Sequence, residues 1–117
     1  MIRHGEEVLY ERMEEFKGGA GHLLIKKLMP QSLVGNGVDL FAHNKLEKGC
    51  EIGWHVHETN CEFYYILKGC GEYNDNGTVV PVVAGDITYT PMGEGHSLRN
   101  PFDEPLEIIA LVAAPRP

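Results

Sequence analysis

The chain has 117 residues, of which 43% are apolar, and its 17 acidic and 10 basic residues give a net charge of −7. This length suits one domain with one core, and no apolar run approaches the roughly 18 residues of a membrane-spanning helix. An acidic chain without a clustered basic face argues against nucleic acids and anionic membranes as partners.

The N-terminal part of the chain contains an ambiguous segment, a break and a strand. Residues 6–16 fit a loose helical stripe, and residues 8–12 within them fit a strand equally well. Glycines in 18–21 then interrupt the chain. We expect a strand at 22–29 and a loop at 30–37.

Two segments in the middle of the chain have clear strand patterns. Alternation places four residues on one face of the segment 39–47: Leu40, Ala42, Asn44 and Leu46. His43 falls on the opposite face, so we expect it outside the core. Residues 62–68 are rich in aromatic and β-branched side chains, which favours a strand.

The second half of the chain reads as short strands joined by tight turns. Residues 74–77, Asn-Asp-Asn-Gly, predict a hairpin turn because Asn and Gly accept positive φ. The strand predicted at 78–83 carries Pro81, which donates no backbone hydrogen bond and therefore indicates a sheet edge or a bulge. Further strands are predicted at 87–90, 96–100 and 106–113. About eight to ten short strands predict an all-β sandwich or barrel.

Three cysteines, Cys50, Cys61 and Cys70, cannot all pair within one chain, and their spacing matches no C-x-x-C metal or redox motif. The N-terminus lacks the apolar core of a secretory signal. We therefore expect a cytoplasmic protein with reduced thiols.

Three histidines and one glutamate form a candidate metal site. His55 and His57 are one residue apart, which in a strand puts both imidazoles on the same face, roughly 6.5–7 Å apart along the backbone. Glu62 begins the next predicted strand after a short turn, and His96 follows a second turn at 91–95. Neutral imidazoles with one carboxylate suit a divalent first-row metal.

Glycines and a proline surround these residues at fixed offsets. Residues 49–69 read G-x5-H-x-H-x4-E-x6-G, and residues 85–100 read G-x5-P-x-G-x2-H-x3-N. Every gap matches the two motifs of the cupin superfamily, which the chain therefore resembles. Chance agreement of ten residue types at fixed offsets is far below about one in 10^10. Asn100, the last motif residue, fits a structural hydrogen bond better than a ligand, although a pocket role stays open.

The resemblance implies one cupin domain over residues 1–117, with the antiparallel jelly-roll β-barrel, or double-stranded β-helix, of that family. It implies one divalent metal per chain, among manganese, iron, nickel, cobalt, copper and zinc, bound by His55, His57, Glu62 and His96. Four protein ligands leave two open positions on a six-coordinate ion, whereas tetrahedral zinc would be closed.

Other candidate site residues lie near these ligands in sequence. Tyr64 and Ile66 share a strand face with Glu62, so we expect both at the cavity. Tyr64 could act as an acid, orient a substrate or only pack in the wall. Arg99 is the nearest cation and could bind a substrate carboxylate or form an exposed ion pair. Trp54 fits a rim, an interface or a stacking role.

Two functions fit this pattern. One is a metal-dependent enzyme acting on a small oxygen-bearing metabolite, as a dioxygenase, a decarboxylase, or a sugar isomerase or epimerase. The other is a non-catalytic module that binds or senses a small molecule or a sugar. The complete ligand set favours the enzyme, but fold and ligands do not name a reaction. We also expect a homodimer, by analogy with small cupins and because Phe63 and Tyr65 alternate onto an outer face.

Overall fold

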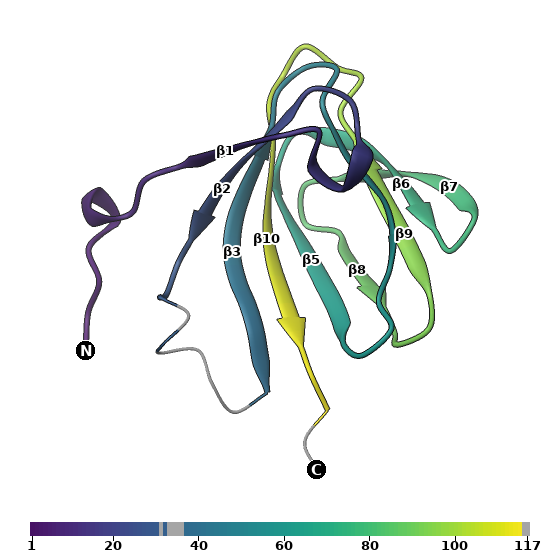
Figure 1. The fold of residues 1–117 in the computed structure, drawn as a ribbon. Coiled ribbons are helices and arrows are strands. Elements are labelled where there is room, and N and C mark those ends of the chain that lie inside the picture. Colours follow the sequence, from purple (N-terminus) through teal and green to yellow (C-terminus); the bar gives the residue numbers. More distant parts are fainter. Residues whose placement is uncertain (31, 33–36, 116–117) are drawn as a thin grey trace.

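The structure is a computed structural model that describes residues 1–30, 32 and 37–115. Within these residues, ten antiparallel strands form two sheets (Figure 1). The larger sheet has the order β1-β2-β3-β10-β5-β8, with bounds Glu11–Glu14, His22–Lys27, Val38–Leu46, Leu106–Ala113, Cys61–Lys68 and Ile87–Thr90. The smaller sheet has the order β4-β9-β6-β7, with bounds Glu51–Val56, Gly95–Arg99, Cys70–Asp75 and Thr78–Val83.

The core lies between the two sheets and is built by alternation. Every second residue of β10 is buried, from Leu106 to Val112, because successive side chains alternate between the two faces of the sheet and one face packs on the core. Leu98 of β9 and Ile66 of β5 are completely buried in the same cluster. Burying such a side chain contributes roughly 1.5–3 kcal/mol, so the facing sheets stabilise one another.

The observed architecture confirms the predicted all-β jelly roll, with two separate sheets in the described part of the chain rather than one closed ladder. Strands β7, β8 and β10 have the predicted bounds. Pro81 lies in β7, which is an edge strand of the smaller sheet, as expected. His43 faces away from the core and contacts Glu107, with Nε2 and Oε1 3.0 Å apart.

Several local expectations were incomplete. The ambiguous segment 6–16 contains the end of a short 3-10 helix, η1 (Gly5–Glu7), and the edge strand β1. Strand β6 was not foreseen, and it includes Asn74 and Asp75 of the predicted turn, so the reversal occurs at Asn76 and Gly77. The predicted loop at 30–37 lies mostly outside the described residues. No helix in the described ranges is long and apolar enough to cross a membrane.

A second 3-10 helix, η2 (Phe16–Gly18), packs directly on β4 of the smaller sheet. The two backbones approach so closely that a Cβ atom on Gly53 would lie 2.1 Å from the carbonyl oxygen of Lys17. A Cβ atom on Gly19 would lie 2.3 Å from the carbonyl oxygen of Glu51. Glycine is therefore required on both sides of this contact, which fixes the N-terminal segment against β4.

Candidate metal centre

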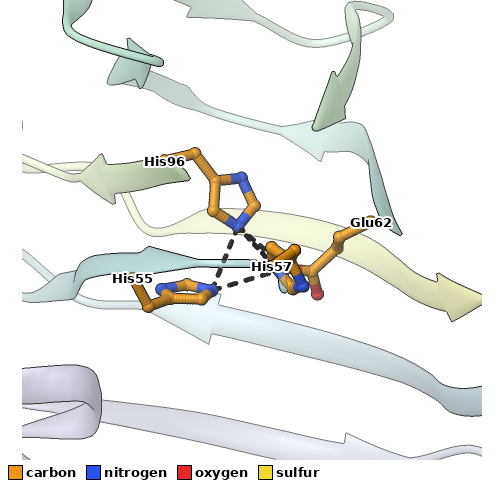
Figure 2. A group of neighbouring side chains, drawn as sticks. All are labelled: His55, His57, Glu62 and His96. Atoms are coloured by element: carbon orange, nitrogen blue, oxygen red, sulfur yellow. Dashed lines mark hydrogen bonds and ion pairs between the residues drawn. The ribbon is translucent and has the colours of Figure 1, made fainter. Parts of the chain in front are cut away.

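The four residues singled out by the sequence come together between the two sheets (Figure 2). The Nε2 atom of His96 lies 3.1 Å from Nε2 of His55 and 3.1 Å from Nε2 of His57. Oε1 of Glu62 lies 2.9 Å from Nε2 of His96, 3.0 Å from that of His57 and 3.7 Å from that of His55. One potential ligand atom from each residue thus lies within 4.8 Å of all the others.

Strand pairing explains this convergence. His55 of β4 is directly opposite His96 of β9 in the smaller sheet, and a register shift between Ile52 and His55 interrupts their ladder. His57 lies just beyond the end of β4. Glu62 reaches the group from β5 of the larger sheet, so the candidate centre joins the two layers.

Hydrogen bonds fix the orientation of the first two imidazoles. Nδ1 of His55 lies 2.8 Å from the carbonyl oxygen of Gly53, and Nδ1 of His57 lies 2.6 Å from Oδ1 of Asn60. The amide nitrogen of Asn60 donates to Asp39 over 3.2 Å, which keeps its oxygen toward His57. Because both partners are acceptors, Nδ1 carries the proton and Nε2 presents a lone pair.

The third imidazole is held by hydroxyl groups. Nδ1 of His96 lies 2.9 Å from the hydroxyl oxygens of both Tyr73 and Thr90, which are 2.7 Å from each other. The ring of Tyr64 stacks on His96 with centroids 4.9 Å apart and an interplanar angle of 19°. His96 is completely buried, so these contacts leave its ring little freedom.

The donor set fits a divalent cation. The unprotonated nitrogens of His55 and His57 point at the same small volume as Nε2 of His96 and a carboxylate oxygen, an arrangement that a positive charge stabilises. Ligand atoms at right angles and about 2.1 Å from an ion would lie about 3.0 Å apart, close to most of the observed separations. The chemistry and spacing of these atoms therefore suit a first-row metal.

The protonation of the metal-free group follows from the same contacts. Burial alone would raise the pKa of Glu62, but hydrogen bonds with His55, His57 and His96 outweigh it and hold that pKa well below 4.5. The hydrogen bond with Glu62 raises the pKa of His57 above 6.5 against the effect of burial. Burial lowers the pKa of His96. Glu62 thus stays ionised, and because a cation needs the neutral form of His57, the raised pKa of this imidazole makes metal binding weaker as the pH falls.

A cavity of about 410 Å³ opens beside this group. His55, His57, Glu62 and Tyr64 form part of its wall. Most of the remaining wall is apolar: Phe16, Ile25, Leu40, Ile52, Val56 and Val112. The other polar residues on the wall are Lys17, Asn44, Glu58, Thr59 and Asn60. The candidate centre is therefore accessible to a small molecule and is not sealed in the core.

The other candidate residues lie in different surroundings. Tyr64 lines the cavity, and burial raises its pKa well above 10. Ile66 shares the face of Glu62 but is completely buried and lies off the cavity wall, contrary to expectation. Arg99 is not brought into the site: it is exposed and donates to Glu72, with Nη2 and Oε1 2.8 Å apart. Asn100 has a structural role, because its amide donates to the carbonyl oxygens of Leu46 and Glu104.

Trp54 lies at the surface next to the candidate centre. Its side chain is about half exposed, and its ring occupies the space that a side chain at position 95 would need, since a Cβ atom on Gly95 would lie 2.4 Å from the ring. Gly95 directly precedes His96, and Trp54 directly precedes His55. The indole therefore packs against the backbone of β9 directly beside His96.

Sequence reasoning missed the residues that support the ligands and close the cavity. Tyr73 and Thr90 approach His96 from two different sheets, and Lys17 reaches the wall from η2. Asn60 offered a signal, because it lies three residues after His57 in a turn where an amide can return to a nearby side chain.

Comparison with known proteins places the chain in a family. The model of the cupin domain matches residues 42–112, and the chain belongs to the cupin family. This range contains all four residues of the candidate centre. It does not contain η2 or the strands β1 and β2.

Individual relatives agree with this assignment. The chain is 38% identical to an oxalate-binding protein of Thermotoga maritima over 112 residues, which are 96% of this chain and 93% of the relative. It superposes with a TM-score of 0.93 and 37% identity on the crystal structure of a predicted oxalate decarboxylase from T. maritima, covering 98% of this chain and all of the other. A cupin 2 conserved barrel domain protein of Salinispora arenicola gives a TM-score of 0.68 and 28% identity, covering 78% of this chain and 75% of the other.

Proposed function

We propose that this protein binds a small chelating carboxylic acid, of which oxalate is the simplest, at one divalent metal held by His55, His57, Glu62 and His96. The observation that carries the proposal is the convergence of three oriented imidazoles and one carboxylate beside an accessible cavity. The name of the T. maritima relative supports a carboxylic acid as the ligand class. Sugars, which the sequence left open, lack this support.

Different residues of the chain have different roles in the proposed binding. Asn60, Tyr73 and Thr90 orient the histidines, so the ligand atoms need little rearrangement when the ion binds. Glu62 offsets part of the metal's charge, and the apolar wall removes water from around the acid. The metal, when bound, supplies a Lewis-acid centre for carboxylate oxygens.

The test begins with protein purified without a chelating tag and loaded with manganese, iron, cobalt, nickel, copper or zinc in turn. Calorimetric titration with oxalate is expected to show one site per chain in the loaded protein. Protein stripped of metal and the His57→Ala variant serve as controls and are expected to bind at least about tenfold more weakly. Loaded protein that binds neither oxalate nor any short hydroxy or oxo acid would contradict the proposal.

A second candidate function is decarboxylation of the bound acid, and the residue that favours it is Glu58. This glutamate lies on the cavity wall outside the group of four ligands. Loss of carbon dioxide from hydrogen oxalate gives formate only if a proton reaches the remaining carbon, and Glu58 is a carboxyl group that could transfer it. Metal-loaded protein should then release equal amounts of carbon dioxide and formate, and Glu58→Gln should slow both. Binding of the acid without release of carbon dioxide and formate would contradict decarboxylation and leave binding as the one supported function.

We also propose a homodimer formed through the outer face of the larger sheet. Four apolar residues lie in register across four strands of that face: Phe41, Leu111, Phe63 and Tyr89. The rings of Phe63 and Tyr89 stack, with centroids 4.9 Å apart. A second copy of the chain would cover this apolar surface. We place the protein in the cytoplasm, where its free cysteines would stay reduced.

A further inference from the structure

Among the described residues that line the cavity, Lys17 is the one with a permanent positive charge. It belongs to η2, outside the range that the cupin family model matches. No carboxylate of a described residue lies within 4.0 Å of its ammonium group, whose neighbour is the ring of Phe16, 5.6 Å away. The charge is therefore available to a molecule that enters the cavity.

The backbone of Lys17 is fixed beside the candidate metal centre. A Cβ atom on Gly53 would lie 2.1 Å from the carbonyl oxygen of Lys17, and the carbonyl oxygen of Gly53 accepts from Nδ1 of His55 over 2.8 Å. Gly53 thus contacts both η2 and a candidate metal ligand. From this position the four-carbon stem of the lysine extends along the wall that His55 and His57 also line.

The charge of Lys17 acts on the candidate centre. The hydrogen bond with Glu62 raises the pKa of His57, and the positive charge of Lys17 opposes this rise. Such an effect requires the two groups to be close, since salt water screens exposed charges beyond about 8–10 Å. Lys17 is exposed whereas His57 and Glu62 are buried, so the lysine lies at the solvent side of the cavity and the ligands lie at its inner end.

A chelated acid offers Lys17 a matching acceptor. Oxalate that binds an ion through one oxygen of each carboxylate keeps a further oxygen on each, and these outer oxygens face away from the ion. An acid held at the inner end of the cavity therefore directs its outer oxygens toward the solvent side, where Lys17 lies. Glu58 and Glu62, the carboxylates on the wall, repel these oxygens, which leaves Lys17 as the charged group that attracts them.

We propose that Lys17 is a specificity-determining residue, which donates a charge-assisted hydrogen bond to an oxygen of the acid that the metal does not bind. This inference rests on the proposed metal-bound acid. It narrows the ligand class to short acids that keep an outer oxygen after chelation. The N-terminal segment thus selects the ligand, while the family motifs supply the metal ligands.

The experiment measures a preference, defined as the affinity for oxalate divided by the affinity for acetohydroxamate. Acetohydroxamate chelates metals through its two oxygens and so presents no outer oxygen to Lys17. Calorimetry on the metal-loaded full-length protein should show that Lys17→Gln lowers the preference at least about tenfold. Lys17→Arg keeps the charge and should keep the preference to within about threefold.

The matched control is Lys68→Gln, which makes the same charge change at an exposed position at the end of β5 away from Glu62. It should have the preference of the parent protein. Elemental analysis should give equal metal contents in all these variants, because Lys17 and Lys68 are not ligands.

The glycine contact that holds η2 provides an independent test. A Cβ atom on Gly19 would lie 2.3 Å from the carbonyl oxygen of Glu51, so Gly19→Ala must displace η2 and with it Lys17. The variant should lose preference as Lys17→Gln does and keep its metal, because all four ligands lie outside η2. Gly5→Ala is the control, since a Cβ atom there would meet no other atom within 4 Å.

The outcomes separate the two proposals. Parent protein that binds oxalate while Lys17→Gln keeps the full preference, or while Lys68→Gln loses as much, would overturn the role of Lys17 and leave the metal-bound acid standing. A Lys17→Arg variant that behaves like Lys17→Gln would overturn the charge as the basis of selection. Full preference in Gly19→Ala would overturn the placement of Lys17 by the glycine contact. Parent protein that binds neither oxalate nor any other short acid would overturn both proposals.

Discussion

The two faces of strand β5 differ in how far their side chains are exposed. The inward face is at most 5% exposed and carries Glu62, Tyr64 and Ile66. The outward face is 37–46% exposed and carries Phe63, Tyr65 and Leu67. Both faces contain aromatic and apolar side chains, yet only the inward face is completed by the chain itself. Alternation alone therefore separates the face that joins the candidate metal centre from the face proposed to meet a second copy of the chain.

The largest expected effect concerns the histidines that converge on Glu62 of the inward face. His57→Ala and His96→Ala should each weaken metal binding about 100- to 1000-fold, because a nitrogen ligand is lost from a four-donor group. His43→Ala is the control, since His43 lies on the outer face and pairs with Glu107. Elemental analysis of the purified variants measures the effect. Full metal content in both ligand variants would exclude these histidines as ligands.

A substitution on the outward face of β5 should weaken the proposed dimer. Phe63→Glu places a charge at the centre of the apolar row and should raise the dimer dissociation constant about 100-fold. Val79→Glu, on the exposed edge strand β7 of the other sheet, is the matched control and should remain dimeric. Light scattering over a range of concentrations distinguishes the two. A parent protein with a monomer mass at every concentration would show that this face has no such role.

A smaller effect is expected for the residues that hold the ligands. Tyr73→Phe removes one hydroxyl from Nδ1 of His96 and should weaken metal binding about 10- to 100-fold without altering the fold. Tyr65→Phe makes the same chemical change on the outward face of β5. Competition with a metal-binding dye gives both affinities, and equal values for the two variants would deny Tyr73 a part in orienting His96.

The smallest effect is the dependence of metal-free stability on pH. The pKa of Glu62 is lower in the folded chain than the ordinary 4.5, so its ionised form stabilises the fold above that pH, and this contribution is lost as the pH falls. A one-unit difference corresponds to about 1.4 kcal/mol. Urea unfolding at pH 5 and pH 3, a range around the ordinary carboxyl pKa and below the raised pKa of His57, should show a weaker pH dependence in Glu62→Gln than in the parent. Glu72→Gln, in an exposed pair with Arg99, should behave like the parent.

The sequence predicted those parts of the site that depend only on strand alternation and short turns. The spacing of His55, His57 and Glu62 depends on strand alternation and one short turn, and His96 follows a turn shaped by Pro91 and Gly93. Those rules act over a few residues, so they can be recognised without the fold. The family motifs then supplied the link between segments that are 34 residues apart, from Glu62 to His96.

The residues that escaped prediction depend on how the sheets are ordered. Tyr73 and Thr90 meet at His96 only because β6 and β9 are neighbours while β8 belongs to the opposing sheet. Lys17 reaches the cavity because two glycines allow η2 to approach β4. Arg99 shows the converse: its closeness to His96 in sequence suggested a role in the site, but alternation directs it outward to Glu72.

The packing of Trp54 on Gly95 gives the protein an internal optical probe. Trp54 is the chain's one tryptophan, so its fluorescence reports a single position, next in sequence to His55 and in contact with the residue before His96. Ions with unpaired electrons bound at the histidines would quench this emission, whereas zinc would leave it bright. Loading of the centre, its selectivity among metals and the rate at which an ion enters or leaves can thus be followed in real time, with no label attached.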